Sequence, residues 1–490
     1  MRKGKCIIVI FCLLAFYGSA QKLRPIKITA ANANIYRDSL NKVIFGTTVF
    51  PYTIMPDSIF TNVNVIDLIS GFPYASIMYP IGNLQSIDKF VVSIDNNLVD
   101  FPAKPTIYLL HPHTSNGKLF IYHSGHCVGT APAEDIFSNN NGVEPGLVIP
   151  KLLKDGYTVL AVPMLHYKAS PLTGVACGYN NHDELFTDSH YPFPLSFFFK
   201  PLIASLNYIG RNTFSAIYMC GLSGGGWATS IYPAIDSSVS CSFPVAGSWP
   251  MPLRELYYPG GDYEQSYPPI FASLLDYHEI YALACLAPAR KMLQINNRYD
   301  ECCFSGSVAH IYYADSVVKT LVGSNGVFKF YLDESGTRHV ISERSLQIIE
   351  TFLANEEGSL IENPQDSATN GSAYSYNIRS NFKVNTIPDL SEIKLSLLKA
   401  PSWLSLDGVN GTISGIVPPD NIFSSSDTIS FKAEDSTGRF VIHDYKLTRK
   451  RNAPYFFTKY NDNQTLWFLP PYSHSMQSIE QLAAGLFFFN

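Results

Sequence analysis

The chain has 490 residues, of which 46% are hydrophobic and 15% are charged, and its formal net charge is −5. This composition supplies enough apolar material for a large folded core and excludes a disordered chain. A slightly acidic balance without a basic run argues against a nucleic-acid partner, and the length suggests two or three domains.

The first residues have the pattern of a secretory signal peptide. Residues 1–5 are positively charged, and residues 7–16 form an apolar run that is too short to span a bilayer. Small residues at 18–20 favour cleavage after Ala20. We therefore expect a secreted, periplasmic or cell-surface protein, with no transmembrane segment in the mature chain.

Cleavage would remove Cys6 and Cys12 from the nine cysteines. An odd number then remains, so at least one thiol has no partner within the chain. The remaining cysteines are Cys127, Cys177, Cys220, Cys241, Cys285, Cys302 and Cys303. A disulfide between the adjacent Cys302 and Cys303 would be strained, so we expect these two to be reduced or separately paired.

Residues 21–85 show no clear pattern, and we expect an N-terminal extension that packs on the main domain. From 86 to 358, apolar runs of strand length alternate with helical patterns, which predicts an α/β domain with a doubly wound, mostly parallel sheet. Strands are expected at 89–94, 106–110, 118–122, 157–162, 215–220, 240–245, 292–295 and 328–332. In such sheets, chemistry occurs at the carboxyl ends of the strands.

The stretch Gly221-Leu222-Ser223-Gly224-Gly225 fits the G-x-S-x-G pattern between a predicted strand and a predicted helix. This context favours a nucleophile elbow, in which small neighbours allow a tight turn and the serine hydroxyl stands above the sheet. The alternative is a glycine-rich turn with an incidental serine.

Two later strands are each followed by a residue that could activate this serine. Asp300 follows one strand as the expected acid, and His339 follows the last strand as the expected base. Glu301 is the alternative acid, and Asp333 and Glu334 are expected to be solvated. Serine, acid and histidine would together form a catalytic triad, because a hydroxyl becomes a good nucleophile only when an oriented imidazole takes its proton.

The oxyanion of such a reaction needs two N–H donors. Gly224 should supply one, and Gly125 or His126, in the loop after the third strand, should supply the other. Nearby histidines at 111, 113, 123 and 126 are interpreted as polar lining of a cleft, and no metal or cofactor is expected. Residues 248–288 are longer than a plain connection and are interpreted as a lid.

With these motifs in place, residues 87–355 resemble the α/β-hydrolase family through the elbow, the Asp300 turn and the His339 turn. The resemblance implies a serine hydrolase that acts on esters or, less often, on amides and peptides. The loop at 123–126 departs from the His-Gly form of the family through an inserted Ser124.

After a polar linker at 359–370, short alternating runs predict a small β-sandwich at 371–450. Residues 374–378, 400–407, 411–415 and 433–438 resemble the immunoglobulin-like, cadherin-like modules of bacterial secreted proteins. The resemblance implies that Trp403 is a core aromatic and that Gly415 ends a strand in a turn. Residues 451–490 form a tail without an assignable pattern.

Three functions remain open from the sequence. The first is a secreted serine esterase acting on a small-molecule or carbohydrate ester, with cell-surface or polysaccharide contact through the β-module. The second is a secreted serine peptidase of the same fold. The third is a non-catalytic binding or adhesion protein on a hydrolase scaffold, which a complete set of nucleophile, acid and base disfavours.

Overall fold

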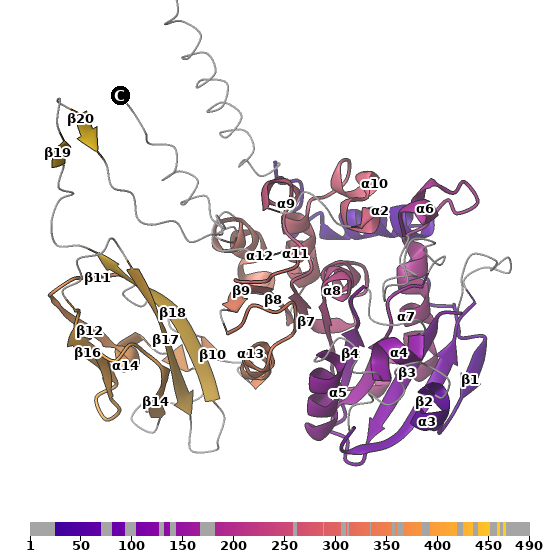
Figure 1. The fold of residues 1–490 in the computed structure, drawn as a ribbon. Helices are drawn as coiled ribbons and strands as arrows, with labels where there is room; N and C mark the ends of the chain where they lie inside the picture. The colour runs from indigo at the N-terminus through magenta and orange to yellow at the C-terminus, as the bar shows by residue number, and fades with distance from the viewer. Residues whose placement is uncertain are drawn as a thin grey trace, which may run out of the picture. The chain divides into compact units, whose positions relative to one another are not determined.

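The computed structural model divides into two compact units, residues 1–343 and 344–490 (Figure 1). The expected domain boundaries, including the one at 358, stay predictions. The expected signal peptide, Cys127 and Cys177 lie outside the described residues. Those residues are 25–69, 81–93, 104–126, 132–137, 144–166, 182–257, 262–287, 289–304, 310, 313–333, 335–354, 358–359, 367–381, 383–384, 393–418, 425–434, 440–450, 458–460 and 464–466.

The first unit is built on one sheet with the strand order β1-β2-β3-β5-β4-β6-β7-β8-β9. The strand pairs in the first part of this order, β1-β2-β3-β5, are antiparallel. The pairs in the rest of the order, β5-β4-β6-β7-β8-β9, are parallel. The mostly parallel α/β sheet of the α/β-hydrolase fold is therefore confirmed. The strands are β1 (Ser58–Phe60), β2 (Leu84–Val91), β3 (Thr106–Pro112), β4 (Leu119–His123), β5 (Thr158–Val162), β6 (Ile217–Leu222), β7 (Val239–Val245), β8 (Arg290–Asn297) and β9 (Gly326–Asp333).

The central strands are buried along their whole length and are mostly apolar, because both of their faces are covered. Every residue of β4, β5 and β6 is buried, as expected of parallel strands between helical layers. Helix α7 ends at Ile209, and the Gly210 that follows has a φ of 79°, in the left-handed range that favours glycine. The helices on the sheet include α5 (Glu144–Lys154), α7 (Ser196–Ile209), α8 (Gly224–Ile235) and α11 (Tyr277–Cys285).

The described residues before β2 contribute two helices and a strand to the first unit. Helix α2 (Ala33–Phe45) packs on α8, and its Arg37 donates to the carbonyl oxygens of Ala234 at 3.0 Å and Leu283 at 3.2 Å. Strand β1 pairs with β2, and α3 (Val65–Ile69) follows it.

The segment interpreted as a lid is in large part core. It contains α9 (Met251–Tyr257), the 3₁₀ turn η4 (Tyr263–Ser266), α10 (Pro268–Phe271) and α11. Every residue of α11 is buried, and Asp276 and Glu279 close its N-terminus in a capping box. The lid interpretation is therefore wrong for α11, which is buried on all sides and packs on α8 and β8.

Shorter elements connect the main ones. Before β6 lie α4 (Pro132–Phe137), α6 (His182–Thr187) and the 3₁₀ turn η3 (Arg211–Thr213). Between β8 and β9 lie a π-helical turn, η6 (Ala314–Val318), and then α12 (Lys319–Val322) and the 3₁₀ turn η7 (Gly323–Asn325).

The second unit begins with α13 (Glu343–Ala354), of which residues 344–354 belong to it, and continues as a β-module. One sheet has the order β11-β18-β17-β14 and another the order β12-β16-β15, around an apolar core that includes Ile413, Ile429 and Phe431. Their strands are β11 (Ser367–Thr369), β12 (Ala373–Asn377), β14 (Lys394–Lys399), β15 (Leu404–Asp407), β16 (Thr412–Ile416), β17 (Ser425–Glu434) and β18 (Phe440–Lys450). Smaller elements are β10 (Gly358–Ser359), α14 (Ile378–Asn381), β13 (Lys383–Val384), β19 (Thr458–Tyr460) and β20 (Gln464–Leu466).

Two residues of this module differ from expectation. Trp403 is partly buried against the core and meets Tyr374 edge-on, with ring centroids 6.2 Å apart. Gly415 lies inside β16 rather than at its end, where it pairs with Tyr374 and Leu404. A side chain at Gly415 would clash with the carbonyl oxygen of Trp403, so close backbone approach, and not a turn, requires the glycine.

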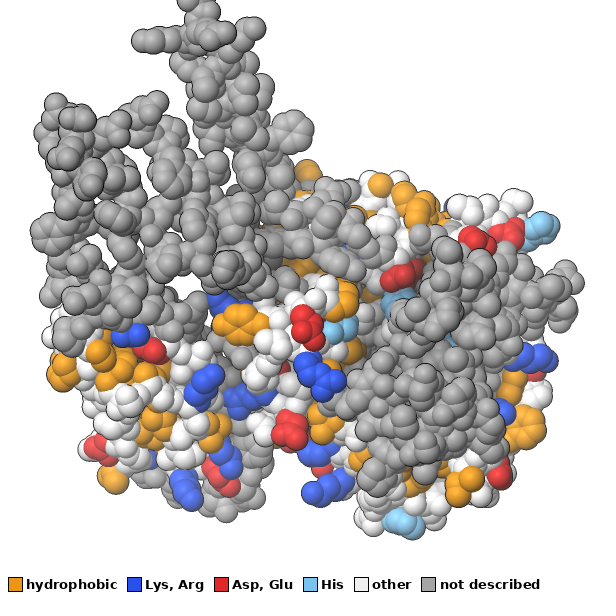
Figure 2. Space-filling model, viewed as in Figure 1, with side chains coloured by type: hydrophobic (Ala, Val, Ile, Leu, Met, Phe, Trp, Pro, Cys, Tyr) orange, Lys and Arg blue, Asp and Glu red, His pale blue; other side chains and the backbone are white. Residues whose placement is uncertain are grey.

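Among the described residues, no helix combines the length and apolar character needed to cross a bilayer. On the face drawn in Figure 2, basic and acidic side chains are interspersed over the coloured residues.

Candidate active site

Ser223 stands at the junction of β6 and α8, at the carboxyl end of a central strand. Its backbone has φ 56° and ψ −120°, a conformation that residues with a side chain seldom adopt. The Ser223 N–H donates to Val245 of β7 at 3.0 Å, and its carbonyl accepts from Trp227 of α8 at 2.8 Å. These two bonds hold the strained turn in place, as a nucleophile elbow requires.

The glycines around Ser223 are required by close packing of backbone on backbone. A Cβ on Gly225 would clash with the carbonyl oxygens of His123 and Ser124 in the loop after β4. A Cβ on Gly221 would meet the backbone of Gly225 at 2.5 Å. The small residues therefore let the elbow sit directly on the loop at 123–126, which brings the two predicted sources of oxyanion donors together.

The candidate donors lie beside the serine. A Cβ built on Gly125 would lie 3.2 Å from the Cβ of Ser223, so this loop faces the nucleophile. In the part of the chain that the structure describes, no hydrogen bond takes up the N–H groups of Gly125 or Gly224. Ser124, the inserted residue, instead accepts at its Oγ from the Met164 N–H at 2.9 Å. Both glycine N–H groups thus remain able to bind a negative oxygen.

Asp300 and His339 form a hydrogen-bonded pair at the ends of β8 and β9. The Nδ1 of His339 lies 2.7 Å from the Oδ2 of Asp300, whose side chain is fully buried. The other oxygen, Oδ1, accepts from the backbone N–H groups of Cys302 at 2.9 Å and Cys303 at 3.1 Å. A carboxylate fixed by three donors can fix the orientation of the imidazole in turn.

The neighbouring acids occupy other positions. Glu301 is exposed, and its N–H donates to the carbonyl of Thr337, so Asp300 is the acid that meets His339. Asp333 was expected to be solvated, but it is 2% exposed and accepts from Ser335 N at 2.8 Å and from the hydroxyl of Ser342. That expectation was wrong because Asp333 closes the turn after β9 from within.

Backbone contacts attach the histidine loop to the acid turn. The Asn297 side chain donates to the carbonyl of Val340 at 2.9 Å and to that of Arg338 at 3.3 Å. The Arg298 N–H donates to the carbonyl of Asp333 at 2.8 Å. The two bonds from Asn297 hold the residues immediately before and after His339. The position of His339 therefore depends on the end of β8 as well as on the strand that precedes it, β9.

The Nε2 of His339 is buried and has no hydrogen bond among the described residues, and no hydrogen bond joins it to Ser223. Since β6, β7, β8 and β9 are adjacent and parallel, Ser223, Asp300 and His339 all follow strands at the same edge of the sheet. Catalytic hydrogen bonds are often long in the absence of substrate and shorten when it binds.

His126 makes contacts that the sequence did not suggest. Its Nε2 lies 3.0 Å from Oε1 of the buried Glu264, and its Nδ1 lies 3.4 Å from Oδ2 of Asp262. Burial alone would lower the pKa of His126, but the two carboxylates outweigh it and the pKa is raised. The ring also packs against Gly224, where a Cβ would clash with it. The segment around η4 is thereby attached to the oxyanion loop.

His123, three residues earlier, has the opposite environment. Its side chain is buried, and its Nδ1 is 2.9 Å from the carbonyl oxygen of Ser124. Burial lowers the pKa of His123 to about 4, with a smaller contribution from His126. His111 lies elsewhere, with its Nε2 2.9 Å from Asp88 on β2. The four histidines therefore do not form one cluster.

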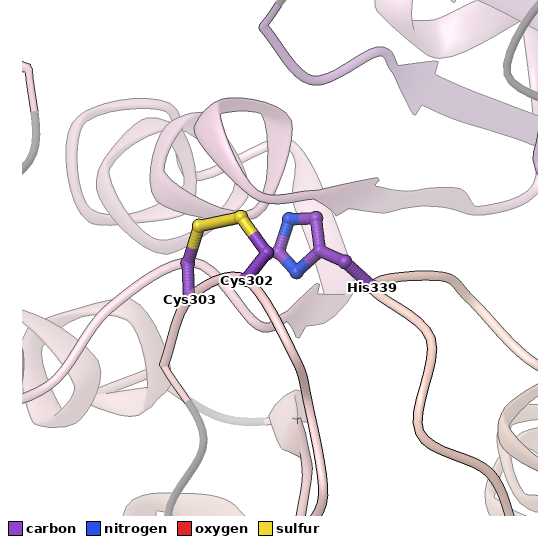
Figure 3. Close-up of side chains that lie close together, drawn as sticks. All are labelled: Cys302, Cys303 and His339. Carbon is purple, nitrogen blue, oxygen red and sulfur yellow. A yellow bond between two sulfur atoms is a disulfide. The ribbon is translucent and has the colours of Figure 1, made fainter.

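Two groups of side chains have the donor types of a metal site. In the first, the two ring nitrogens of His126 face different carboxylates, Asp262 and Glu264. That arrangement suits an ion pair with both N–H groups donating, rather than an imidazole binding a cation. The second group is Cys302, Cys303 and His339. Its sulfur atoms are joined to each other (Figure 3), so they are not thiolate ligands in this state.

This disulfide overturns the expectation that Cys302 and Cys303 are reduced or separately paired. The disulfide lies in the turn after Asp300, where both cysteine N–H groups also donate to one carboxylate oxygen. Cys220 and Cys241 are buried, as expected of small core residues, and Cys285 is likewise buried.

Comparison with known proteins bears on both units. Residues 358–450 match the family model described as "Putative Ig domain", which confirms the immunoglobulin-like module. No curated protein matches the chain. Among solved structures, the chain is similar to "Methylesterase BT1017", at 15% identity and a TM-score of 0.41, over 68% of this chain and 64% of that one.

Two further structures are similar at the same level. One is an acetyl xylan esterase from Paenibacillus sp. R4, with 14% identity and a TM-score of 0.36, over 69% of this chain and 98% of that one. The other is Est1E from Butyrivibrio proteoclasticus, with 14% identity and a TM-score of 0.35, over 55% of this chain and 98% of that one. The chain spans less than two thirds of the length of the methylesterase.

Proposed function

We propose that this protein is a serine hydrolase that cleaves carboxylic esters through an acyl-enzyme on Ser223. The observation that carries the proposal is the Asp300–His339 hydrogen bond of 2.7 Å, at the same sheet edge as a serine in a strained strand-to-helix turn. This combination supplies an oriented base and a partly exposed nucleophile, and each has little structural reason to be there otherwise.

In the proposed first half-reaction, the Oγ of Ser223 attacks the ester carbonyl carbon and its proton passes to Nε2 of His339. Asp300 keeps the Nδ1–H of His339 directed at itself and stabilises the imidazolium that forms. The tetrahedral intermediate then collapses, the C–O bond to the alcohol breaks, and His339 returns the proton to the departing oxygen. The acyl group remains on Ser223.

In the second half-reaction, His339 takes a proton from water, and the resulting nucleophile attacks the acyl-enzyme. Collapse of the second intermediate releases the carboxylic acid and returns the proton to Ser223. In both halves, the N–H of Gly224 and that of Gly125 or His126 would bind the negative oxygen. Loss of one such donor typically costs about 3 kcal/mol of transition-state stabilisation.

The decisive experiment compares Ser223→Ala with Ser215→Ala on a p-nitrophenyl ester. Ser215 precedes the other end of β6 and is exposed, so its variant is a matched control that should keep wild-type activity. Ser223→Ala should lose on the order of 10⁶-fold in kcat and its labelling by a fluorophosphonate, while it retains its circular dichroism. An unchanged rate in Ser223→Ala would remove this residue from the mechanism.

Substrate class and location belong to the same proposal. The predicted signal peptide and the immunoglobulin-like module support a secreted or cell-surface enzyme, and a carbohydrate ester is our proposed substrate. Rates on acetyl, butyryl and feruloyl esters should exceed those on aminoacyl and dipeptidyl amides. The reverse order would favour a peptidase, and a chain that neither turns over substrate nor reacts with the phosphonate would favour a binding protein.

A further inference from the structure

The disulfide between Cys302 and Cys303 lies beside the Asp300–His339 pair, and the proposed mechanism does not use it. Cys302 is exposed and Cys303 is half-buried. The two sulfur atoms and a ring nitrogen of His339 all lie within 4.8 Å of one another, and Figure 3 shows the disulfide next to the imidazole. A reducible bond therefore stands at the proposed base of the reaction.

The same two cysteines hold the proposed acid through their backbone. Both N–H groups donate to Oδ1 of Asp300, at 2.9 and 3.1 Å, while Oδ2 meets His339. A bond between adjacent sulfur atoms closes a small ring that contains the peptide between the cysteines. This ring limits rotation of the peptide that carries the Cys303 N–H, so the Cys303 donor to Asp300 is held in one arrangement.

We propose that the Cys302–Cys303 disulfide positions Asp300 and makes the activity sensitive to dithiol reductants. This inference rests on the proposed function, because its effect on rate passes through Asp300 and His339. Opening the ring frees the Cys302–Cys303 peptide to rotate, Asp300 loses its fixed donor from Cys303, and His339 is oriented less well. Cys302 and Cys303 are thus positioning residues that act through the acid.

The chemical step is thiol–disulfide exchange with a dithiol. One thiolate of the reductant attacks the exposed Sγ of Cys302, the S–S bond breaks, and Cys303 leaves as a thiolate that takes up a proton. The second thiol of the reductant then attacks the mixed disulfide and releases Cys302 as a thiol. Two electrons pass from the dithiol, which becomes a disulfide, to the cysteine pair.

The other cysteines in the described part of the chain are poor targets for this exchange. Cys220, Cys241 and Cys285 are buried and carry no disulfide to reduce. Burial raises the pKa of the Cys285 thiol to about 12, which suppresses its thiolate. The effect of a reductant on the described site should therefore come from Cys302 and Cys303.

Reduction also creates a ligand set that is absent in the oxidised state. Two thiolates and an imidazole nitrogen are the donors that Zn²⁺ and Cd²⁺ prefer, and these three groups already lie close together. An ion bound there would occupy a nitrogen of His339. The reduced protein should therefore be inhibited by Cd²⁺ at concentrations that leave the oxidised protein active.

The test measures kcat and KM of the full-length wild-type chain before and after treatment with dithiothreitol. The double variant Cys302→Ser/Cys303→Ser is measured in the same two conditions. Thiol alkylation and mass spectrometry establish the state of the pair. Reduction of wild type should lower kcat between about tenfold and about 100-fold with little change in KM, and reoxidation should restore it. The double variant keeps both backbone N–H groups, should start at the lower kcat, and should respond to neither dithiothreitol nor Cd²⁺.

A wild-type protein that is fully reduced at this pair and keeps its kcat, KM and resistance to Cd²⁺ would overturn the inference. So would a loss of activity that accompanies global loss of circular dichroism, because the disulfide would then be merely structural. Equal sensitivity of the double variant to dithiothreitol would assign the effect to another cysteine and would also overturn it.

A readout without turnover separates this inference from the proposed function. The proton between His339 and Asp300 should give a far-downfield proton resonance, identified by its absence in His339→Gln, and reduction should shift or broaden it in Ser223→Ala. If no ester is hydrolysed but this resonance responds, the proposed function fails while the positioning role stands. If esters are hydrolysed and neither kcat nor the resonance responds, the positioning role alone fails.

Discussion

The turn that carries Ser223 and the turn that carries Asp300 both follow parallel strands of one sheet, but they are held by different forces. The serine turn is held by close backbone packing, in which Gly225 and Gly221 leave no room for a side chain. The acid turn is held by directed hydrogen bonds from Cys302 and Cys303 and by the disulfide that joins them. The first is fixed by steric exclusion, and the second by polar and covalent bonds.

This difference predicts how each turn fails. A turn held by close packing should be sensitive to side-chain volume. Any added carbon atom should destabilise it, whereas a change of redox conditions should have little effect. A turn held by polar and covalent bonds should be sensitive to the chemical nature of its side chains. A substitution that keeps their size but changes their charge should therefore abolish activity. The following predictions test that contrast, beginning with the largest expected effect.

Asp300→Asn keeps the size of the side chain and removes its charge. The amide cannot stabilise an imidazolium and favours the wrong tautomer of His339, so kcat should fall by about 10⁴-fold with little change in thermal stability. Initial rates on a p-nitrophenyl ester measure the effect. Glu301→Gln, next in the chain and exposed, is the control and should be close to wild type; a larger loss in that variant would reassign the acid.

Gly225→Ala adds one carbon where the carbonyl oxygens of His123 and Ser124 lie. Backbone atoms cannot move aside as a flexible side chain can, so the free energy of unfolding should fall by at least about 3 kcal/mol. Urea unfolding measures the change. Gly336→Ala, with nothing within 4 Å of its added Cβ, should unfold as wild type does, and equal midpoints for the two variants would contradict the steric account.

His123 predicts a loss of stability in acid. Its pKa is about 4 when folded and about 6.5 when unfolded. The unfolded chain therefore binds more protons between these values, and stability falls as the pH falls through that window, by up to roughly 3 kcal/mol. His123→Asn keeps a donor without titrating, so it should lose less stability than wild type from pH 6.5 to pH 4. If the free energy of unfolding changed with pH equally in wild type and His123→Asn, His123 would not be the cause of the acid destabilisation.

His126 predicts a smaller effect of opposite sign. Its pKa is raised in the folded protein because Asp262 and Glu264 outweigh the effect of burial. The stabilisation is therefore complete below about pH 6.5 and is lost as the pH rises through the folded pKa. His126→Gln should be less stable than wild type by about 1 to 2 kcal/mol at pH 6, and the gap should narrow at higher pH. A gap that widens instead would sink the ion-pair assignment.

The sequence was sufficient for the sheet and the elbow because both depend on local patterns. Apolar runs between helical segments predicted the parallel strands, and each of β4 to β9 lies within a few residues of its predicted position. The G-x-S-x-G spacing predicted the strained turn at Ser223, which the backbone has. Asp300 was separated from Glu301 by its place in the turn, and it is the one that meets His339.

The contacts that link distant segments could not be predicted in the same way. Asp262 and Glu264 lie in a Tyr- and Pro-rich stretch, and no spacing relates them to His126, which is more than a hundred residues earlier. The burial of α11 was missed because an insertion that fills the core and one that covers a site have similar lengths and compositions. The disulfide was missed because the strain expected of a bond between adjacent cysteines favoured two separate thiols.

Helix α2 has a consequence for how the chain is made. Arg37 and Lys27 bond to Ala234, Leu283 and Glu279, across sequence separations of 197 to 252 residues. When the N-terminal segment leaves the ribosome, these partners have not yet been translated. The segment must therefore wait for more than half of the polypeptide before it docks, and such non-local closure slows folding. Nascent chains that stall before residue 283 should leave the apolar face of this helix accessible to chaperones.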